Sequence, residues 1–198
     1  MAIIVDKEQK RKDIALSCKD LFVSQSMNSV TISQIAKVAG VGKGTLYEYF
    51  KNKEEIIFEL VDLLLEKHSA ELQKKLLEQK SARHKVKSFA EFFYAKEHEE
   101  LRILYKDFVS ISLSAPSEEL LAFQSVCFNN YYLWFEELFK RGVAEGELIE
   151  ASLGLTKGAF VTAEGMFLAS CTTNVFLNLE QDLNEYIDNL FNIIEAKQ

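Results

Sequence analysis

The sequence is poor in the residues that interrupt regular structure. Among 198 residues there are only one Pro and 8 Gly, whereas an all-β fold needs a turn about every 8 to 12 residues. The same scarcity excludes collagen-like and low-complexity chains. Because 48% of the residues are hydrophobic, a chain of this length can bury a substantial core. We therefore expect an all-α fold.

Long hydrophobic runs are also missing. No stretch without a charged residue is longer than 16 residues, the length of the run from Leu120 to Phe135, and this is shorter than the roughly 20 residues that span a bilayer. The apolar run from Ala2 to Val5 is too short for the hydrophobic region of a signal peptide. We expect no membrane partner and a cytoplasmic location.

Cysteine and histidine are scarce and scattered. The odd number of cysteines and the absence of any CxxC argue against a disulfide framework or a zinc site, and the histidines lack metal-ligand spacing. We expect buried thiols, histidines on helix surfaces, and neither metal nor cofactor. The residues concerned are Cys18, Cys127 and Cys171, and His68, His84 and His98.

Positive charge is in the minority, since the net charge is −7, but it is unevenly distributed. Residues 1–53 contain nine Lys/Arg against five Asp/Glu, and the remainder contains 14 against 25. We divide the chain after residue 53 because the sequence motif described below ends there. A basic N-terminal segment favours a nucleic-acid contact there in spite of the acidic total.

Apolar spacing predicts short helices at the N-terminal end. A helix is expected from Asp13 to Val23, because its apolar residues recur at helical intervals. Thr31 and Gln34 have the spacing of a capping box, which predicts that a second helix begins there, and Gly40 is suited to end it. A third short helix should run from Lys43 to about Phe50.

Two short helices joined by a glycine-containing turn predict a helix-turn-helix. A longer fourth helix is expected from the cap at Asn52 towards Gln79. The rest of the chain has helical periodicity throughout, with Pro116 at the first position of a new helix. About nine helices are expected in all.

The segment 31–53, TISQIAKVAGVGKGTLYEYFKNK, resembles the N-terminal DNA-binding domain of the tetracycline-repressor (TetR) family of bacterial transcription regulators. Its "IA..AGV" and "GTLY.(H/Y)F..K" patterns carry the resemblance, which covers about a quarter of the chain. The resemblance implies a helix-turn-helix DNA-binding domain over 1–53 and an effector-binding and dimerisation domain over 54–198.

The start of the third helix supplies the candidates for base contacts. The N-terminal residues of a recognition helix meet base edges, and Lys43, Gly44 and Thr45 are small or polar enough to do so. Two residues depart from the family pattern. Gly42 replaces a hydrogen-bonding cap, and Glu48 places a negative charge on a helix that should meet phosphates.

Phosphate contacts are expected around this helix. The resemblance assigns them to the hydroxyls of Tyr47 and Tyr49, while Lys53 adds its charge at the start of the fourth helix, which is itself a suitable anion site. Thr31 is expected to hold a phosphate near its capping position, and Ser33 to face the same groove. The alternative is a three-helix lobe with surface tyrosines that do not contact DNA.

The helix around residues 123–139 is rich in aromatic residues. At helical spacing most of them should form core, but the resemblance implies an effector cavity in this part of the fold. The expected lining residues are Phe93, Tyr105, Phe108, Phe128, Tyr131, Trp134, Phe135, Phe167 and Glu164. Burying a carboxylate is costly unless it is paired, so Glu164 either reaches solvent, meets a Lys or Arg, or binds the ligand.

Small residues form a line on the helix expected over 151–173. Gly154, Gly158, Gly165 and Ala169 fall almost on one side, where glycine costs about 1 kcal/mol relative to alanine unless close packing requires it. The helix packed there is either in the same chain or, as the resemblance implies, in a second copy. In the latter case Tyr186 and Leu190 of the last helix should share the dimer interface.

The resemblance, together with these patterns, implies a ligand-responsive transcriptional regulator. The expected protein is a repressor that binds a pseudo-palindromic double-stranded operator as a homodimer and is released by a hydrophobic or aromatic small molecule. The alternative is a helical carrier or sensor of such a molecule that does not act through DNA. An enzyme is disfavoured, because no nucleophile with an adjacent base, metal cluster or phosphate-cradling loop is evident.

Overall fold

The structure, a computed structural model, describes residues 6–197 and therefore does not include the Ala2–Val5 run. The described chain is helical, apart from one isolated bridge between Leu148 and Glu195, so the all-α prediction is confirmed. The α-helices are α1 (Lys7–Ser17), α2 (Lys19–Ser24), α3 (Ile32–Val38), α4 (Lys43–Tyr49), α5 (Lys53–Glu78), α6 (Ala82–Ala90), α7 (Glu99–Ser114), α8 (Glu118–Ala144), α9 (Thr156–Thr172) and α10 (Leu179–Ile194). Three 3-10 segments are interspersed: η1 (Glu91–Phe93), η2 (Lys96–His98) and η3 (Glu150–Leu155).

The first predicted helix is longer than expected and is divided in two. It begins at Lys7 because the Asp6 side chain accepts the backbone N–H groups of Glu8, at 3.0 Å, and Gln9, at 3.2 Å. It is interrupted at Cys18, which separates α1 from α2. If these two helices are counted as one, the described chain has the nine helices that the sequence predicted.

By its contacts the chain divides into two compact units. The first comprises residues 6–69 and Ile103–Leu121, and the second comprises Ala70–Arg102 and residues 122–197. This division differs from the boundary predicted after residue 53, because the start of α5 and most of α7 belong to the same unit as the helix-turn-helix. The functional division into 1–53 and 54–198 stays a prediction.

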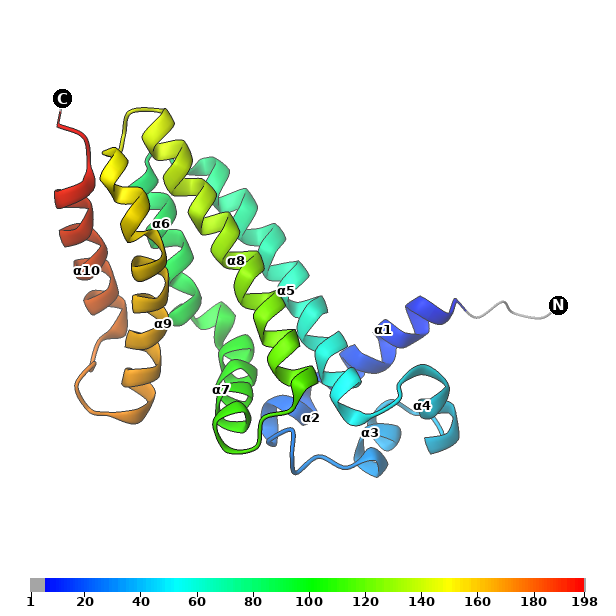
Figure 1. The fold of residues 1–198 in the computed structure, drawn as a ribbon. Coiled ribbons are helices and arrows are strands. Elements are labelled where there is room, and N and C mark those ends of the chain that lie inside the picture. The colour runs from blue at the N-terminus through cyan, green and yellow to red at the C-terminus, as the bar shows by residue number, and fades with distance from the viewer. Residues whose placement is uncertain (1–5, 198) are drawn as a thin grey trace. The chain divides into compact units, whose positions relative to one another are not determined.

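The first unit has a small apolar core contributed by every one of its helices. Phe22, Leu46 and Phe50 are buried together with the inward side of α5, which includes Ile56 and Leu60. Helices α3 and α4 pack against each other in this unit (Figure 1). The core therefore fixes the inner faces of the two short helices and leaves their outer faces exposed.

In the second unit α10 packs against α6 and α9 (Figure 1). The core between them includes Phe89, Phe139 and Phe191. On α6, Lys87 donates to Asp188 of α10 at 2.8 Å, and this hydrogen bond lowers the pKa of the Asp188 carboxyl. The contact links the two helices beside the apolar core.

Three local predictions are wrong. Pro116 precedes the helix instead of opening it, since Ser117 caps α8 by accepting the Leu120 N–H at 3.1 Å. Cys171 is exposed rather than buried, and His68 is buried rather than on a helix surface. The errors at Cys171 and His68 come from inferring the buried face of a helix from local spacing alone, whereas the error at Pro116 comes from overlooking Ser117 as the cap.

Cys18 agrees with its prediction, because it is buried and burial raises the pKa of its thiol. Within residues 6–197 no group of three or more His, Cys, Asp or Glu side chains is placed to hold a metal ion. No helix in the same part of the chain is both long and apolar enough to cross a membrane.

Candidate nucleic-acid interface

The expected base-contacting residues lie on the first turn of α4. This helix begins after Gly42, whose φ of −70° and ψ of 152° are those of an N-cap, and no side chain caps it. Lys43 and Gly44 are exposed and Thr45 is half-buried, while Leu46 is buried in the core of the first unit. A short helix anchored by its inner face therefore presents a small, positively charged first turn to solvent.

The start of α3 has the predicted capping box. The Gln34 N–H donates to Thr31 Oγ1 at 3.3 Å, and the Thr31 N–H donates to Gln34 Oε1 at 2.8 Å. The Thr31 hydroxyl also lies 2.8 Å from Gln34 Oε1 and donates to it. Thr31 and Ser33 are both exposed, so a phosphate could be reached from this helix start, although the Thr31 proton is already engaged within the chain.

The two tyrosines of α4 differ in exposure. Tyr47 is 56% exposed, whereas Tyr49 is half-buried. Among the hydrogen bonds of residues 6–197, neither phenolic hydroxyl has a partner within the chain. Both hydroxyls are therefore available to an external acceptor such as a phosphate oxygen.

Lys53 has a role that its sequence position did not reveal. Its Nζ donates to the carbonyl of Val30 at 3.0 Å and lies 3.4 Å from that of Asn28. An ammonium has three donors, so one N–H remains for a phosphate. Lys53 thus fixes the turn that leads into α3 in addition to carrying the charge predicted for DNA contact.

The sequence did not predict the role of Arg11, which holds the C-terminal end of α4 in place. Its Nη1 donates to the carbonyl of Tyr49 at 2.6 Å, and its Nε donates to Glu59 at 2.7 Å. The guanidinium also lies over the Phe50 ring, 4.3 Å from its centroid. The last carbonyls of a helix have no partner within it, so Arg11 satisfies one of them and ties α4 to α5.

The sequence also did not predict the role of Asp107 on α7, whose partners are distant along the chain. Its carboxylate accepts the Ser26 hydroxyl at 2.7 Å and the Met27 N–H at 2.6 Å. Together with Lys53 it holds the turn before α3 from two directions. Because these partners are about 80 residues apart, no local sequence pattern indicates that they interact. Only knowledge of long-range contacts would have identified Asp107.

The predicted effector residues do not all lie in one unit. Tyr105 and Phe108 belong to the first unit, where Phe108 packs edge-on against Phe58 with centroids 6.1 Å apart. The other seven predicted residues belong to the second unit.

Several of those seven fill space in the core. Phe135 and Phe167 are buried. Phe93 lies 5.5 Å from Phe167 by ring centroids, and Phe89 packs against Trp134 at 5.5 Å. Phe128 and Tyr131 are half-buried, as is Glu164, which interacts with other groups of the chain. The aromatic residues therefore serve as packing in the state described, and their contact with a ligand stays a prediction.

The predicted dimer residues lie on α9 and α10. Gly158 and Gly165 are exposed, and a Cβ built on either would meet no atom within 4 Å. This excludes close packing of these glycines against a helix of their own chain, which was one of the two alternatives. Ala169 is half-buried, and Tyr186 and Leu190 pack against the core of the second unit.

The helix-turn-helix, its exposed basic first turn and the all-α remainder define the class as a helix-turn-helix DNA-binding protein. A sequence model described as "Bacterial regulatory proteins, tetR family" matches residues 18–60. The helix-turn-helix of this chain is therefore of the TetR type, and the proteins that it resembles are DNA-binding transcriptional regulators. This confirms the family predicted from the sequence and gives no support to the alternative of a carrier that does not act through DNA.

The relatives that match are regulators rather than enzymes. The chain is 24% identical over 135 residues to the HTH-type transcriptional regulator QacR of Staphylococcus aureus, a match that covers 65% of this chain and 68% of QacR. A TetR-family regulator from Cytophaga hutchinsonii has the same fold with a TM-score of 0.81 at 14% identity, over 99% of this chain and 100% of that one. A SmeT–triclosan complex has a TM-score of 0.72 at 19% identity, over 96% and 93%.

Proposed function

We propose that this chain is a repressor that binds a pseudo-palindromic operator as a homodimer and is released from it by a small hydrophobic or aromatic effector. The observation that carries the proposal is the exposed, basic first turn of α4 on a helix whose inner face is anchored in a core. We assign DNA binding to residues 1–53 and effector binding and dimerisation to 54–198. The protein would act in the cytoplasm and would have no catalytic role.

The DNA contacts divide into those that read bases and those that bind phosphates. We assign base reading to Lys43, Gly44 and Thr45, because they are at the N-terminal end of a recognition helix. Phosphate contacts are assigned to five residues around it: Thr31, Ser33, Tyr47, Tyr49 and Lys53. Base contacts determine sequence preference, whereas phosphate contacts add affinity that hardly depends on sequence.

Two single substitutions test this division. Lys43→Gln should change the preferred base at one position of each half-site, because a good contact to a base edge discriminates by about 1–3 kcal/mol. Tyr47→Phe should weaken binding to all duplexes by a similar factor, because it removes one hydroxyl donor from an exposed ring. Fluorescence anisotropy with a set of single-base operator variants at fixed salt measures both effects. The assignment fails if Lys43→Gln shifts every duplex equally, or if Tyr47→Phe binds all of them as wild type does.

The dimer is proposed to form through the exposed glycine line of α9 and the adjoining α10. One recognition helix reads few base pairs, and dimers of such proteins place two helices roughly 34–36 Å apart on the duplex. Gly158 and Gly165 have no close neighbour within the chain, and a glycine line without an intramolecular partner suits the close approach of another helix. Val161 and Ile193 add exposed apolar surface on the same two helices.

Gly158→Leu is expected to shift the protein from dimer to monomer. A leucine should not harm the isolated chain, because no atom lies within 4 Å of the new Cβ and leucine is the better helix former. In the dimer the added side chain would hold the two helices apart. Sedimentation velocity at micromolar concentration measures the change, with far-UV circular dichroism as the folding control. A monomeric wild type, or a variant that dimerises as wild type does, would contradict the proposed interface.

The effector is proposed to enter the aromatic region of the second unit. Apolar side chains with a few polar anchors are typical of small-molecule sites, and the complex of SmeT with triclosan shows a similar fold that holds a small molecule. Such a ligand must have a higher affinity for the conformation that is released from DNA than for the conformation that binds DNA. A ligand with equal affinity for both conformations would not shift the equilibrium between them. If Glu164 is an anchor, the effector would carry a positive charge.

A further inference from the structure

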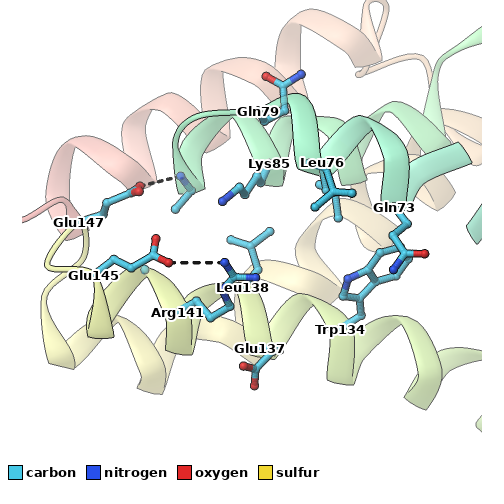
Figure 2. Close-up of a pocket in the computed structure, with 13 residues that line it drawn as sticks. Gln73, Leu76, Gln79, Lys85, Trp134, Glu137, Leu138, Arg141, Glu145 and Glu147 are labelled. Carbon is cyan, nitrogen blue, oxygen red and sulfur yellow. Dashed lines mark hydrogen bonds and ion pairs between the residues drawn. The ribbon is translucent and has the colours of Figure 1, made fainter. Parts of the chain in front are cut away.

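A groove with a volume of about 260 Å³ lies within the second unit, away from most of the proposed effector residues. It is bounded by the end of α5, the start of α6 and the last turns of α8 (Figure 2). Trp134 is the only predicted effector residue that lines it. Its volume is below the roughly 300–1,000 Å³ of sites for drug-sized ligands, so it suits a small molecule.

One wall of the groove is apolar. Leu76 and Leu138 line it and are largely buried, and the half-buried Trp134 lies beside them. The Trp134 ring is held edge-on against Phe89 with centroids 5.5 Å apart, which fixes its orientation. This wall offers a flat surface to an aromatic or short alkyl group.

The acidic residues of the groove are already engaged or directed elsewhere. Glu147 accepts the N–H of Ala82, the first residue of α6, at 2.7 Å, where the helix dipole favours a negative charge. Glu145 pairs with Arg141 at 3.5 Å. Figure 2 shows that Glu137 points away from the groove. Among the described residues, none of the three carboxylates forms an ion pair with Lys85, the other basic residue of the groove.

Lys85 is one of the two basic residues of the groove. Its side chain points into the groove from α6, and that of Arg141 points into it from α8 (Figure 2). Within the described chain the Lys85 ammonium has neither an ion pair nor a hydrogen bond. Arg141 has five donors, so its single contact with Glu145 leaves others unused.

We propose that this groove binds a small amphipathic carboxylate. Its apolar part would lie against Trp134, Leu76 and Leu138, and its carboxylate would accept charge-assisted hydrogen bonds from Lys85 and Arg141. The site shares no residue with the proposed DNA contacts and only Trp134 with the residues predicted for the effector. Its test uses the chain without DNA, so a negative result would leave the proposed function untouched.

Trp134 makes the groove directly observable, because it is the only tryptophan in the chain. Titration with 3-phenylpropionate should change the tryptophan fluorescence and saturate, whereas 3-phenylpropylamine, of similar shape but opposite charge, should not. Calorimetry should give one site per chain for the carboxylate. Absence of saturable binding by the carboxylate, or equal binding of the amine, would overturn the proposal.

Substitution of Lys85 locates the binding. Lys85→Gln should raise the Kd for 3-phenylpropionate about tenfold or more, and Lys85→Arg should retain most of the affinity because the charge remains. Lys140→Gln is the matched control, since Lys140 is on α8 but pairs with Glu136 at 2.6 Å and does not line the groove. It should change the Kd less than twofold. Equal losses in Lys85→Gln and Lys140→Gln would show a non-specific charge effect and refute the site.

Discussion

Replacing Arg11 with Met is expected to lower the free energy of unfolding by about 2 kcal/mol and operator affinity by roughly tenfold. Met keeps much of the aliphatic bulk but removes the donors to the Tyr49 carbonyl and to Glu59. A hydrogen bond to a charged group contributes about 1.5–3 kcal/mol, and the value is at the lower end here because a third of the Arg11 side chain is exposed to solvent. The C-terminal end of α4 would lose its tie to α5, so the recognition helix would be less well ordered before it meets DNA.

Urea unfolding and operator titration of the same preparation measure the two effects. Lys7→Met is the matched control, because it removes one charge from an exposed position on the same helix and should change the free energy of unfolding by less than about 0.5 kcal/mol. Arg11→Lys should give a free energy of unfolding and an operator affinity between those of Arg11→Met and Lys7→Met. A single ammonium cannot donate to the Tyr49 carbonyl and to Glu59 with the geometry of a guanidinium. An Arg11→Met protein that binds operator as tightly as Lys7→Met would show that Arg11 does not position the recognition helix.

Phe139→Ala is expected to lower the free energy of unfolding by about 3–5 kcal/mol, the range for removing a buried aromatic side chain. Phe139 is 0% exposed, and its ring lies 5.1 Å from that of Phe135 and 6.1 Å from that of Phe191 by centroids. The cavity would therefore open at the point where α8 meets α10. Such a loss is a large part of the 5–15 kcal/mol typical of a folded protein.

The measurement is urea unfolding at one fixed protein concentration, because the proposed dimerisation would make the free energy of unfolding depend on concentration. Leu177→Ala is the control, as Leu177 is 87% exposed and its loss should cost less than about 0.5 kcal/mol. If Phe139→Ala were as stable as Leu177→Ala, the second unit would not depend on this core.

Features encoded by neighbouring residues could be predicted from the sequence. The capping box at Thr31 needs only residues three apart, and the short α4 was evident from Leu46 and Phe50. The exposed glycine line of α9 was also visible, although its spacing could not show whether the packed helix belonged to the same chain. In the structure Gly158 is exposed and has no close neighbour, which excludes a helix of the same chain, whereas packing against a second copy stays a proposal.

Features that depend on distant partners could not be predicted in this way. Arg11 reaches Tyr49 and Glu59 across 38 and 48 residues, and Asp107 reaches Ser26 across 81. The aromatic residues illustrate the same limit, because their spacing is identical whether they line a cavity or fill a core. Local patterns therefore predicted the surface that should meet DNA, but not the contacts that hold it in place.

The central claim is that this chain recognises a specific DNA sequence, and the affinity ratio between specific and scrambled duplexes tests it most directly. Repeated selection from random duplexes should enrich a pseudo-palindrome, and wild-type protein should bind it about 10³-fold or more tightly than a scrambled duplex of equal length at the same salt concentration. Equal affinity for the selected and scrambled duplexes would contradict the account.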